Sequence, residues 1–321
     1  MKKPGRPGSG GPTLRAISLR SGHGLMTVSR ALGPEAHRVA EVKRLEIQRI
    51  AAEMGYRPNL NVQALRRGSG NLVGLLCERL DGRTHEILIG LHDGLLSHGL
   101  LPFLLMTEHQ PPRDGKTPGE SAILHLIERR IAAIVAVAND PLRPPTWLSR
   151  LPEETRERGI PTVAIAATPE DHDLPMIRAD LTWAAQQMVD YVLARGPRQM
   201  AIIGTPEDDP WHDAICAALA AECTRRGLTC QIKPDPAWRP DPNTGVCATN
   251  EAARTRLLGH PGSPLAWIAG ADAPYLPFPG LAVDLNYRAL GAAAADHLVG
   301  RLAGATDLQP MDLPGRINIQ E

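Results

Sequence analysis

The chain has 321 residues, 43% of them hydrophobic, and its 35 Lys and Arg balance 35 Asp and Glu, so the formal net charge is zero. This length suits a small domain plus a two-lobed body, and no stretch approaches the roughly 20 apolar residues that a membrane span needs. Five cysteines without a CxxC pair argue against a disulfide framework and a zinc site, so we expect core cysteines, a cytoplasmic protein, no metal and no cofactor.

The charge is divided unevenly along the chain. Residues 1–70 hold 13 Lys and Arg and 4 Glu, which gives +9, and the remaining residues carry −9. A basic segment on an acidic body indicates that the first part meets a polyanion, and a merely solvated basic face is the alternative. Residues 1–12 are rich in Pro and Gly with no apolar run behind them, so we expect a disordered tail and no signal peptide.

Three short helices are predicted between residues 13 and 59. Thr13 can cap the first, which turns Leu14 and Ile17 inward, and Gly22 suits a tight turn. The second is expected over residues 25–32 and the third over residues 39–54, with an apolar stripe formed by Val39, Val42, Ile47, Ile50, Ala51 and Met54. Two helices joined by a turn and braced by a third form a helix-turn-helix, whose second helix can enter a major groove.

This segment resembles the DNA-binding head of the lactose-repressor (LacI) family. The resemblance is carried by Thr13-Leu14, Ile17, Gly22, Thr27-Val28-Ser29-Arg30, Val39, Gly55-Tyr56-Arg57-Pro58-Asn59 and Ala64-Leu65. Departures from the family pattern occur at Ala16, Ser18, Ser21, His23 and Gly24. We expect His23, which replaces a Val in the turn, to loosen the small core.

The start of the second helix reaches base edges first. Arg30 suits a bidentate contact with guanine, whereas Leu25 and Met26 can only pack on apolar groups such as thymine methyls. The resemblance assigns contacts with the DNA backbone to Thr13, Thr27, Ser29, Tyr56 and Asn59. Packing of Tyr56 on the third helix is an equal alternative.

Residues 60–70 form a short basic linker that is too isolated for a stable helix by itself. The segment resembles the family's hinge helix, which folds when two subunits meet on DNA. Leu65 matches the side chain that wedges into the minor groove, with Arg66 beside it. A plain linker is the alternative.

Short apolar runs alternate with amphipathic stretches over residues 71–321. Strands are expected at residues 72–77, 101–106, 131–138, 161–166, 199–204, 229–233, 265–268 and 281–283, and helices at 85–98, 121–130, 147–158, 181–195, 211–226, 248–258 and 287–303. This order predicts parallel sheets covered on both faces. The resemblance implies the family's two-lobed, periplasmic-binding-protein-like body. The expected fold is thus an α-helical helix-turn-helix head plus an α/β two-lobed body.

The resemblance places an effector cleft between the lobes. Its candidate lining residues are Arg83, Thr84 and His85 on the loop after the first strand, together with Asn139, Trp211 and Asp272. Trp211 stands where many family members have an Arg, and its ring either stacks on a ligand or only fills the hinge side of the cleft. The other candidates are either pocket residues or surface loop residues. A carbohydrate or sugar acid is the ligand class that the resemblance implies.

The second lobe is expected to be shortened. The helix at residues 248–258 leads through residues 260–264 straight into the strand at 265–268, so one strand–helix unit of the family, with its ligand-facing Asn-Asp pair, is predicted to be missing. A narrower second sheet with an exposed apolar edge would follow. The loss would also remove a dimer surface.

The predicted function is a sequence-specific transcriptional regulator, and the resemblance favours a repressor. As a homodimer it would bind a pseudo-palindromic operator, and a small ligand in the cleft would change operator affinity. A regulator without ligand response and a solute-binding protein remain alternatives. An enzyme is disfavoured because the sequence contains no nucleophile elbow, phosphate loop or metal-ligand cluster.

Overall fold

A computed structural model of the chain describes residues 12–33, 35–56, 70–78, 80–138, 145–166, 174–197, 199–204, 211–233, 238, 240–241, 243–255, 257, 263–269, 279–305 and 310–320. The chain divides into two compact units, Met1–Gly70 and Asn71–Glu321, which we call the head and the body. The predicted tail and hinge helix, with Leu65 and Arg66, lie outside the described residues, as do Asn59, Asn139 and Asp272.

The head contains the three predicted helices, α1 (Leu14–Ser21), α2 (Leu25–Ala31) and α3 (Glu41–Glu53), and a 3-10 turn, η1 (Ala36–Arg38). The Thr13 hydroxyl caps α1 by accepting a hydrogen bond from the Ala16 amide at 3.2 Å. Gly22 ends α1 with φ 69°, in the left-handed region that the tight turn requires. The buried core consists of Ile17, Val28, Ala31, Val39, Ile47, Ile50 and Ala51.

One detail of the head differs from the expectations, and another adds to them. Val42 is not part of the apolar stripe: its side chain is 80% exposed, because at 100° per residue it falls outside the face that carries Ile47 and Ala51. His23 is held in the turn by polar contacts. Its Nε2 lies 3.2 Å from a Glu46 carboxylate oxygen on α3, and its carbonyl accepts from Ser18 Oγ at 2.7 Å.

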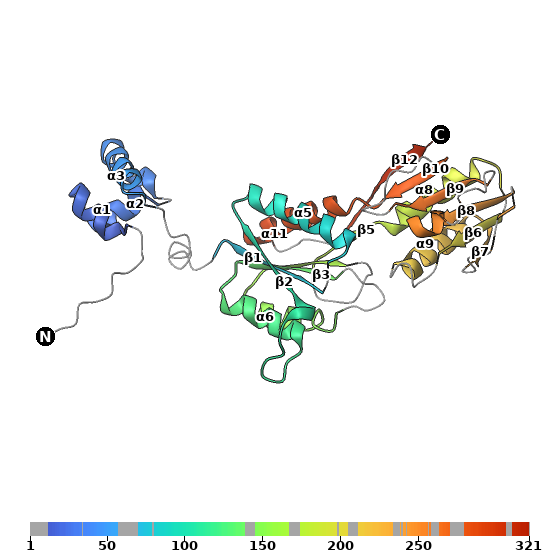
Figure 1. Cartoon of the computed structure of the whole chain (residues 1–321), viewed down its shortest axis with the longest axis horizontal. Helices are drawn as coiled ribbons and strands as arrows, with labels where there is room; N and C mark the ends of the chain where they lie inside the picture. The colour runs from blue at the N-terminus through green and yellow to red at the C-terminus, as the bar shows by residue number, and fades with distance from the viewer. Residues whose placement is uncertain are drawn as a thin grey trace. The chain divides into compact units, whose positions relative to one another are not determined.

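The first lobe of the body contains a parallel six-stranded sheet with the order β11-β5-β4-β3-β1-β2. Its strands are β1 (Leu72–Cys77), β2 (Leu101–Met106), β3 (Ala133–Ala138), β4 (Thr162–Ala166), β5 (Met176–Ala179) and β11 (Met311–Leu313). Helices α5 (Gly82–Ser97) and α11 (Tyr287–Leu302) cover one face, and α6 (Pro118–Glu128) covers the other (Figure 1). The remaining elements are η2 (Thr107–His109) and α7 (Leu151–Arg156).

The second lobe contains another six-stranded sheet, with the order β12-β10-β9-β8-β6-β7. Its strands are β6 (Gln199–Ile203), β7 (Thr229–Lys233), β8 (Thr244–Ala248), β9 (Leu265–Ile268), β10 (Gly280–Asp284) and β12 (Arg316–Gln320). Only β12 runs antiparallel to its neighbour, β10. The helices of this lobe are α8 (Leu181–Leu193), α9 (His212–Arg225) and α10 (Glu251–Thr255).

The expected loss of a strand from the second lobe is wrong. Strand β8 occupies residues assigned from the sequence to a connection and the start of a helix, and it gives the second sheet as many strands as the first. The short segment is instead the connection between the parallel strands β7 and β8, residues 234–243, where a crossover of a dozen or more residues is usual. Trp238 of this connection packs against the buried cluster of the second lobe that includes Val246 and Trp267.

The chain crosses between the two lobes three times, from β5 to α8, from β10 to α11 and from β11 to β12. Arg178 on β5 donates two hydrogen bonds, of 2.7 and 3.1 Å, to the Asp312 carboxylate on β11. The Asp180 amide donates to the Leu313 carbonyl at 2.9 Å, and its carboxylate caps α8 at the Trp183 amide. Two of the crossings are therefore bonded to each other where they leave the first sheet.

Helices α5 and α11 pack backbone against backbone. A Cβ atom on Gly291 would overlap the carbonyl oxygen of Ile87, and one on Gly90 would overlap that of Arg288. At Gly94 an added Cβ would lie 2.7 Å from the Ala295 Cβ. Glycine is required here for close approach of the two helices. Among the described residues, no helix combines the length and the apolar character that a membrane crossing demands.

Replacing Gly291 with Ala should destabilise the body. The added methyl group meets rigid backbone, and overpacking of this kind costs about 1–3 kcal/mol. Urea denaturation monitored by circular dichroism measures the change in the free energy of unfolding. Asp296→Ala, on the same helix with a side chain 74% exposed, is the matched control and should stay within about 0.5 kcal/mol of the parent. Equal stability of the two variants would contradict the close packing.

Candidate functional site

The outward face of α2 presents the residues that the sequence assigned to base contacts. Leu25 and Met26 are 48% and 64% exposed, and the Arg30 side chain is 49% exposed. Val28 and Ala31 face the opposite way and are fully buried against α1 and α3. Thr27 and Ser29 lie between the two faces and are half-buried. The helix thus exposes one cationic and two apolar side chains on a basic head.

Arg30 is not isolated on this face. Its Nε lies 3.5 Å from a Glu35 carboxylate oxygen, and Arg38 donates to the other oxygen of Glu35 at 3.1 Å. The side chains of Arg30, Glu35 and Arg38 are all about half exposed, so these ion pairs are screened by water and are worth about 0–1 kcal/mol each. Arg30 can therefore leave Glu35 for another hydrogen-bond acceptor at little cost in free energy.

The predicted backbone-contact residues occupy different places in the head. Thr13 is exposed at the start of α1, where its hydroxyl caps the helix. Tyr56 is half-buried and packs against the head's core, which is the structural role considered from the sequence. Its amide donates to the Ala51 carbonyl at 2.8 Å across Gly55, which has φ 67°, and so caps the end of α3.

The sequence analysis placed the candidate residues Arg83, Thr84 and His85 of the body on a loop. In the structure they lie in the first turn of α5. The helix begins at Gly82 because the Asp81 carboxylate caps it by accepting from the Thr84 amide at 2.7 Å. Thr84 is 3% exposed, whereas His85 points into solvent and Arg83 is half-buried.

Arg83 and Trp211 come from different lobes and meet. The Arg83 guanidinium carbon lies 5.9 Å from the centre of the Trp211 indole, which immediately precedes α9. The Tyr287 ring meets the same indole edge-on, with ring centres 6.1 Å apart and planes at 78°. Trp211 is only 1% exposed. Its ring is therefore occupied by protein contacts in this structure.

Reasoning from the sequence missed a polar cluster at the carboxyl end of β8. His212 Nδ1 lies 3.1 Å from Thr249 Oγ1, and its Nε2 lies 3.3 Å from the Cys216 sulfur. The neighbouring Asn250 uses its carbonyl oxygen to accept from the Ala253 amide at 2.8 Å, which starts α10. Its buried Nδ2 has no partner among the described residues. A Thr-Asn pair directly after a strand was the available signal, and it was lost because β8 was not recognised.

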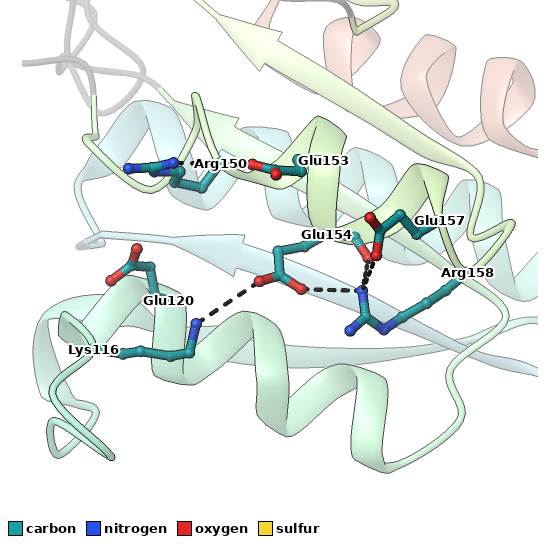
Figure 2. A pocket seen from close by; sticks show the side chains of 7 residues that line it. All are labelled: Lys116, Glu120, Arg150, Glu153, Glu154, Glu157 and Arg158. Carbon is teal, nitrogen blue, oxygen red and sulfur yellow. Dashed lines mark hydrogen bonds and ion pairs between the residues drawn. The ribbon is translucent and has the colours of Figure 1, made fainter.

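A depression on the first lobe lies apart from these candidates. It is lined by Lys116, Glu120, Arg150, Glu153, Glu154, Glu157 and Arg158 (Figure 2). Glu154 lies 3.8 Å from Lys116 Nζ and 3.1 Å from Arg158 Nη1, so one carboxylate is shared between two cations. None of the predicted effector residues lines this depression, and its three cations and four carboxylates nearly balance.

The cysteines are core residues in the body. Burial raises the pKa of the Cys77 thiol to about 11 and that of Cys216 to about 12. Burial also raises the pKa of Cys247. Cys223 donates a hydrogen bond to Cys230, which raises the pKa of Cys223 and lowers the pKa of Cys230. Only Cys230 is partly exposed.

Thiol labelling of the native chain should therefore be selective. At pH 8 an aromatic disulfide reagent should modify Cys230 quickly and the other four cysteines at least tenfold more slowly, because the thiolate is the reactive form and burial keeps them protonated. Absorbance of the released thiolate measures the count, and urea should expose all five. Cys230→Ser is the control that removes the fast phase. Several fast thiols in the native chain would contradict the burial.

Comparison with known proteins gives relatives in sequence and in fold, although no family model matches the chain. The regulator PtxS of Pseudomonas putida is 24% identical over 203 residues, which cover 61% of this chain and 55% of PtxS. The repressor CytR of Escherichia coli (strain K12) is 25% identical over 267 residues, or 81% of this chain and 72% of CytR. The match to PtxS thus spans little more than half of that protein.

The fold has a solved counterpart. The structure of the Lac repressor dimer bound to operator and the anti-inducer ONPF has a TM-score of 0.74 with this chain. The two are 16% identical, and the match covers 96% of this chain and 98% of the other. The predicted fold class, a helical head followed by a two-lobed α/β body, is confirmed.

Proposed function

We propose that this chain, which is related to the LacI-family regulators in sequence and in fold, is a sequence-specific DNA-binding regulator that responds to a small ligand. One observation carries the proposal: α2 buries Val28 and Ala31 and thereby presents Leu25, Met26 and Arg30 outward from a basic head. A short helix with such a face fits a major groove, where Arg recognises guanine and apolar side chains recognise thymine methyl groups.

The rest of the head fits the same role. The charge of +9 on residues 1–70 attracts the phosphate backbone, and the −9 on the remainder keeps the body away from it. In this proposal Thr13, Thr27, Ser29, Tyr56 and Asn59 contact the DNA backbone. In this proposal residues 60–70 fold as a hinge helix on DNA, with Leu65 as a minor-groove wedge and Arg66 beside it.

A homodimer would place two heads on a pseudo-palindromic operator, because two-fold symmetry of the protein requires two-fold half-sites. We assign the chain to repression in the cytoplasm and expect no enzymatic activity; its relatives PtxS and CytR are regulators. The ONPF-bound Lac repressor supports a ligand-responsive body.

The proposed effector is a carbohydrate or sugar acid that binds between the lobes. Ligands of open α/β sheets bind beyond the carboxyl ends of the strands. Arg83, Thr84 and His85 follow β1, and Trp211 follows β6. Asn250 follows β8, and its unpartnered amide is a donor for a ligand oxygen. Asn139 and Asp272 complete the proposed set. Effector binding changes the angle between the lobes, and coupling of this kind is typically about 1–3 kcal/mol.

The second candidate function is a DNA-binding regulator without ligand response. The observation that favours it is the burial of Trp211, since a ring enclosed by Arg83 and Tyr287 leaves no free face for a ligand. A thermal-shift screen with sugars and sugar acids separates the two candidates. A rise in melting temperature with any of these compounds supports the effector. An unchanged melting temperature with every compound supports the second candidate.

Arg30→Ala should lower affinity for the preferred duplex and relax the preference at one base step. Selection from a random duplex pool first gives the half-site, and fluorescence anisotropy then compares single-base variants. The loss of one bidentate contact corresponds to about 1–3 kcal/mol of discrimination. Arg38→Ala is the matched control, because Arg38 also pairs with Glu35 but lies outside α2. An equal loss for all sequences would refute base recognition by Arg30, and no preferred duplex would refute the proposed function.

Glu35→Gln should raise duplex affinity a few-fold, roughly the effect of releasing a screened surface ion pair. The change frees the Arg30 guanidinium for guanine. Glu41→Gln, which removes the same charge from a carboxylate beside Arg44 on α3, is the control. Both variants alter the net charge of the head equally, so a larger gain for Glu35→Gln assigns the effect to the partners of Glu35, and a gain that persists when Arg38 is also replaced with Ala assigns it to Arg30. Equal gains would show that net charge alone is responsible.

A further inference from the structure

The contact of Arg83, Trp211 and Tyr287 joins the two lobes of the body. Arg83 lies in the first turn of α5, and Tyr287 is the first residue of α11, which packs on α5 in the first lobe. Trp211 belongs to the second lobe, where it precedes α9. The indole of the second lobe therefore contacts both a cation and an aromatic ring of the first lobe.

The contact lies beside a crossing of the chain. Strand β10 ends at Asp284, and α11 begins at Tyr287 after only Leu285 and Asn286. Asn286 adopts φ 52°, in the left-handed region, and its amide is held by the Asp284 carboxylate at 2.7 Å. A rotation of one lobe on the other must pass through these two residues. Such a rotation displaces Tyr287 relative to Trp211 at once.

We propose that Trp211 is a latch between the lobes, which holds them in the arrangement seen here and which the effector must release or re-form. This inference rests on the proposed function, because it assigns Trp211 to the regulation of the cleft and not to stacking on the ligand. The indole is 1% exposed and Tyr287 3% exposed, so opening the cleft exposes both rings to water. The cation above the indole adds electrostatic attraction to this buried area.

The second lobe supplies a matched pair that is not a latch. The Arg254 guanidinium carbon of α10 lies 5.0 Å from the centre of the Trp267 ring on β9, and Trp267 is 2% exposed. Both residues belong to the same lobe. A change at Trp267 therefore weakens the core of that lobe without touching the contact between lobes.

Hydrogen–deuterium exchange of the full chain, without DNA or ligand, tests the latch. Two variants are used so that one folding defect cannot decide the outcome: Trp211→Phe and Arg83→Met, which keeps an unbranched apolar stem. The measured quantity is amide exchange in the first turns of α9 and α5. In α9 the Ile215 amide donates to the Trp211 carbonyl, and in α5 the His85 amide donates to the Asp81 carbonyl. We expect about tenfold faster exchange at α9 in Arg83→Met, although the substitution lies in the other lobe.

Trp267→Phe is the control, which should accelerate exchange in β9 and leave the first turn of α5 unchanged. Unchanged exchange at α9 in Arg83→Met, or acceleration confined to the substituted lobe in both variants, overturns the latch. Anisotropy with the selected duplex is run in parallel. Cross-lobe acceleration without any duplex preference would retain the latch and refute the proposed function. Duplex preference without cross-lobe acceleration would do the reverse.

Discussion

The three crossings between the lobes are the constraint on which the body depends. Each sheet is closed at one edge by a strand that arrives late in the chain, β11 in the first lobe and β12 in the second. Arg178 and Asp312 bind the first and third crossings together at the first sheet. All three crossings are short, and the first and third are hydrogen-bonded to each other. Any rotation of one lobe on the other that leaves both sheets intact therefore has to occur near residues 179–181, 284–287 and 313–316.

In the head, the outward surface is determined by the rotation of the short helix α2 about its own axis. Seven residues of α2 give two turns, and burial of Val28 and Ala31 fixes which side faces out. That choice alone places Leu25, Met26 and Arg30 on one surface. The same rule explains the error at Val42, where the apolar spacing fitted a stripe but the observed face of α3 is centred on Ile47, Ile50 and Ala51.

Elements with a strong periodic or apolar signal were predictable from the sequence, and elements defined by tertiary pairing were not. The three head helices, β1, β2 and α11 were predicted close to their observed bounds. Strands β5, β8, β11 and β12 are short or interrupted by Gly and polar residues, so their strand character comes from the neighbours that they pair with. The supposed loss in the second lobe followed from missing β8. For the site, proximity of Arg83 and Trp211 was implied only by the resemblance, and Tyr287 and Asn250 gave no recognised signal.

If a ligand binds between the lobes as proposed, the burial of Trp211 limits the affinity that it gains there. A ligand that stacks on the indole must first separate it from Arg83 and Tyr287, and the free energy of that separation reduces its apparent affinity. A ligand that leaves the indole in place and engages Asn250 or His85 avoids this cost, but it gains nothing from the latch. Only a ligand that favours one lobe angle over another shifts the equilibrium, however tightly it binds. In the proposed function, the response to an effector therefore depends on the difference in ligand affinity between two arrangements of the lobes, one with the Trp211 contact formed and one with it broken.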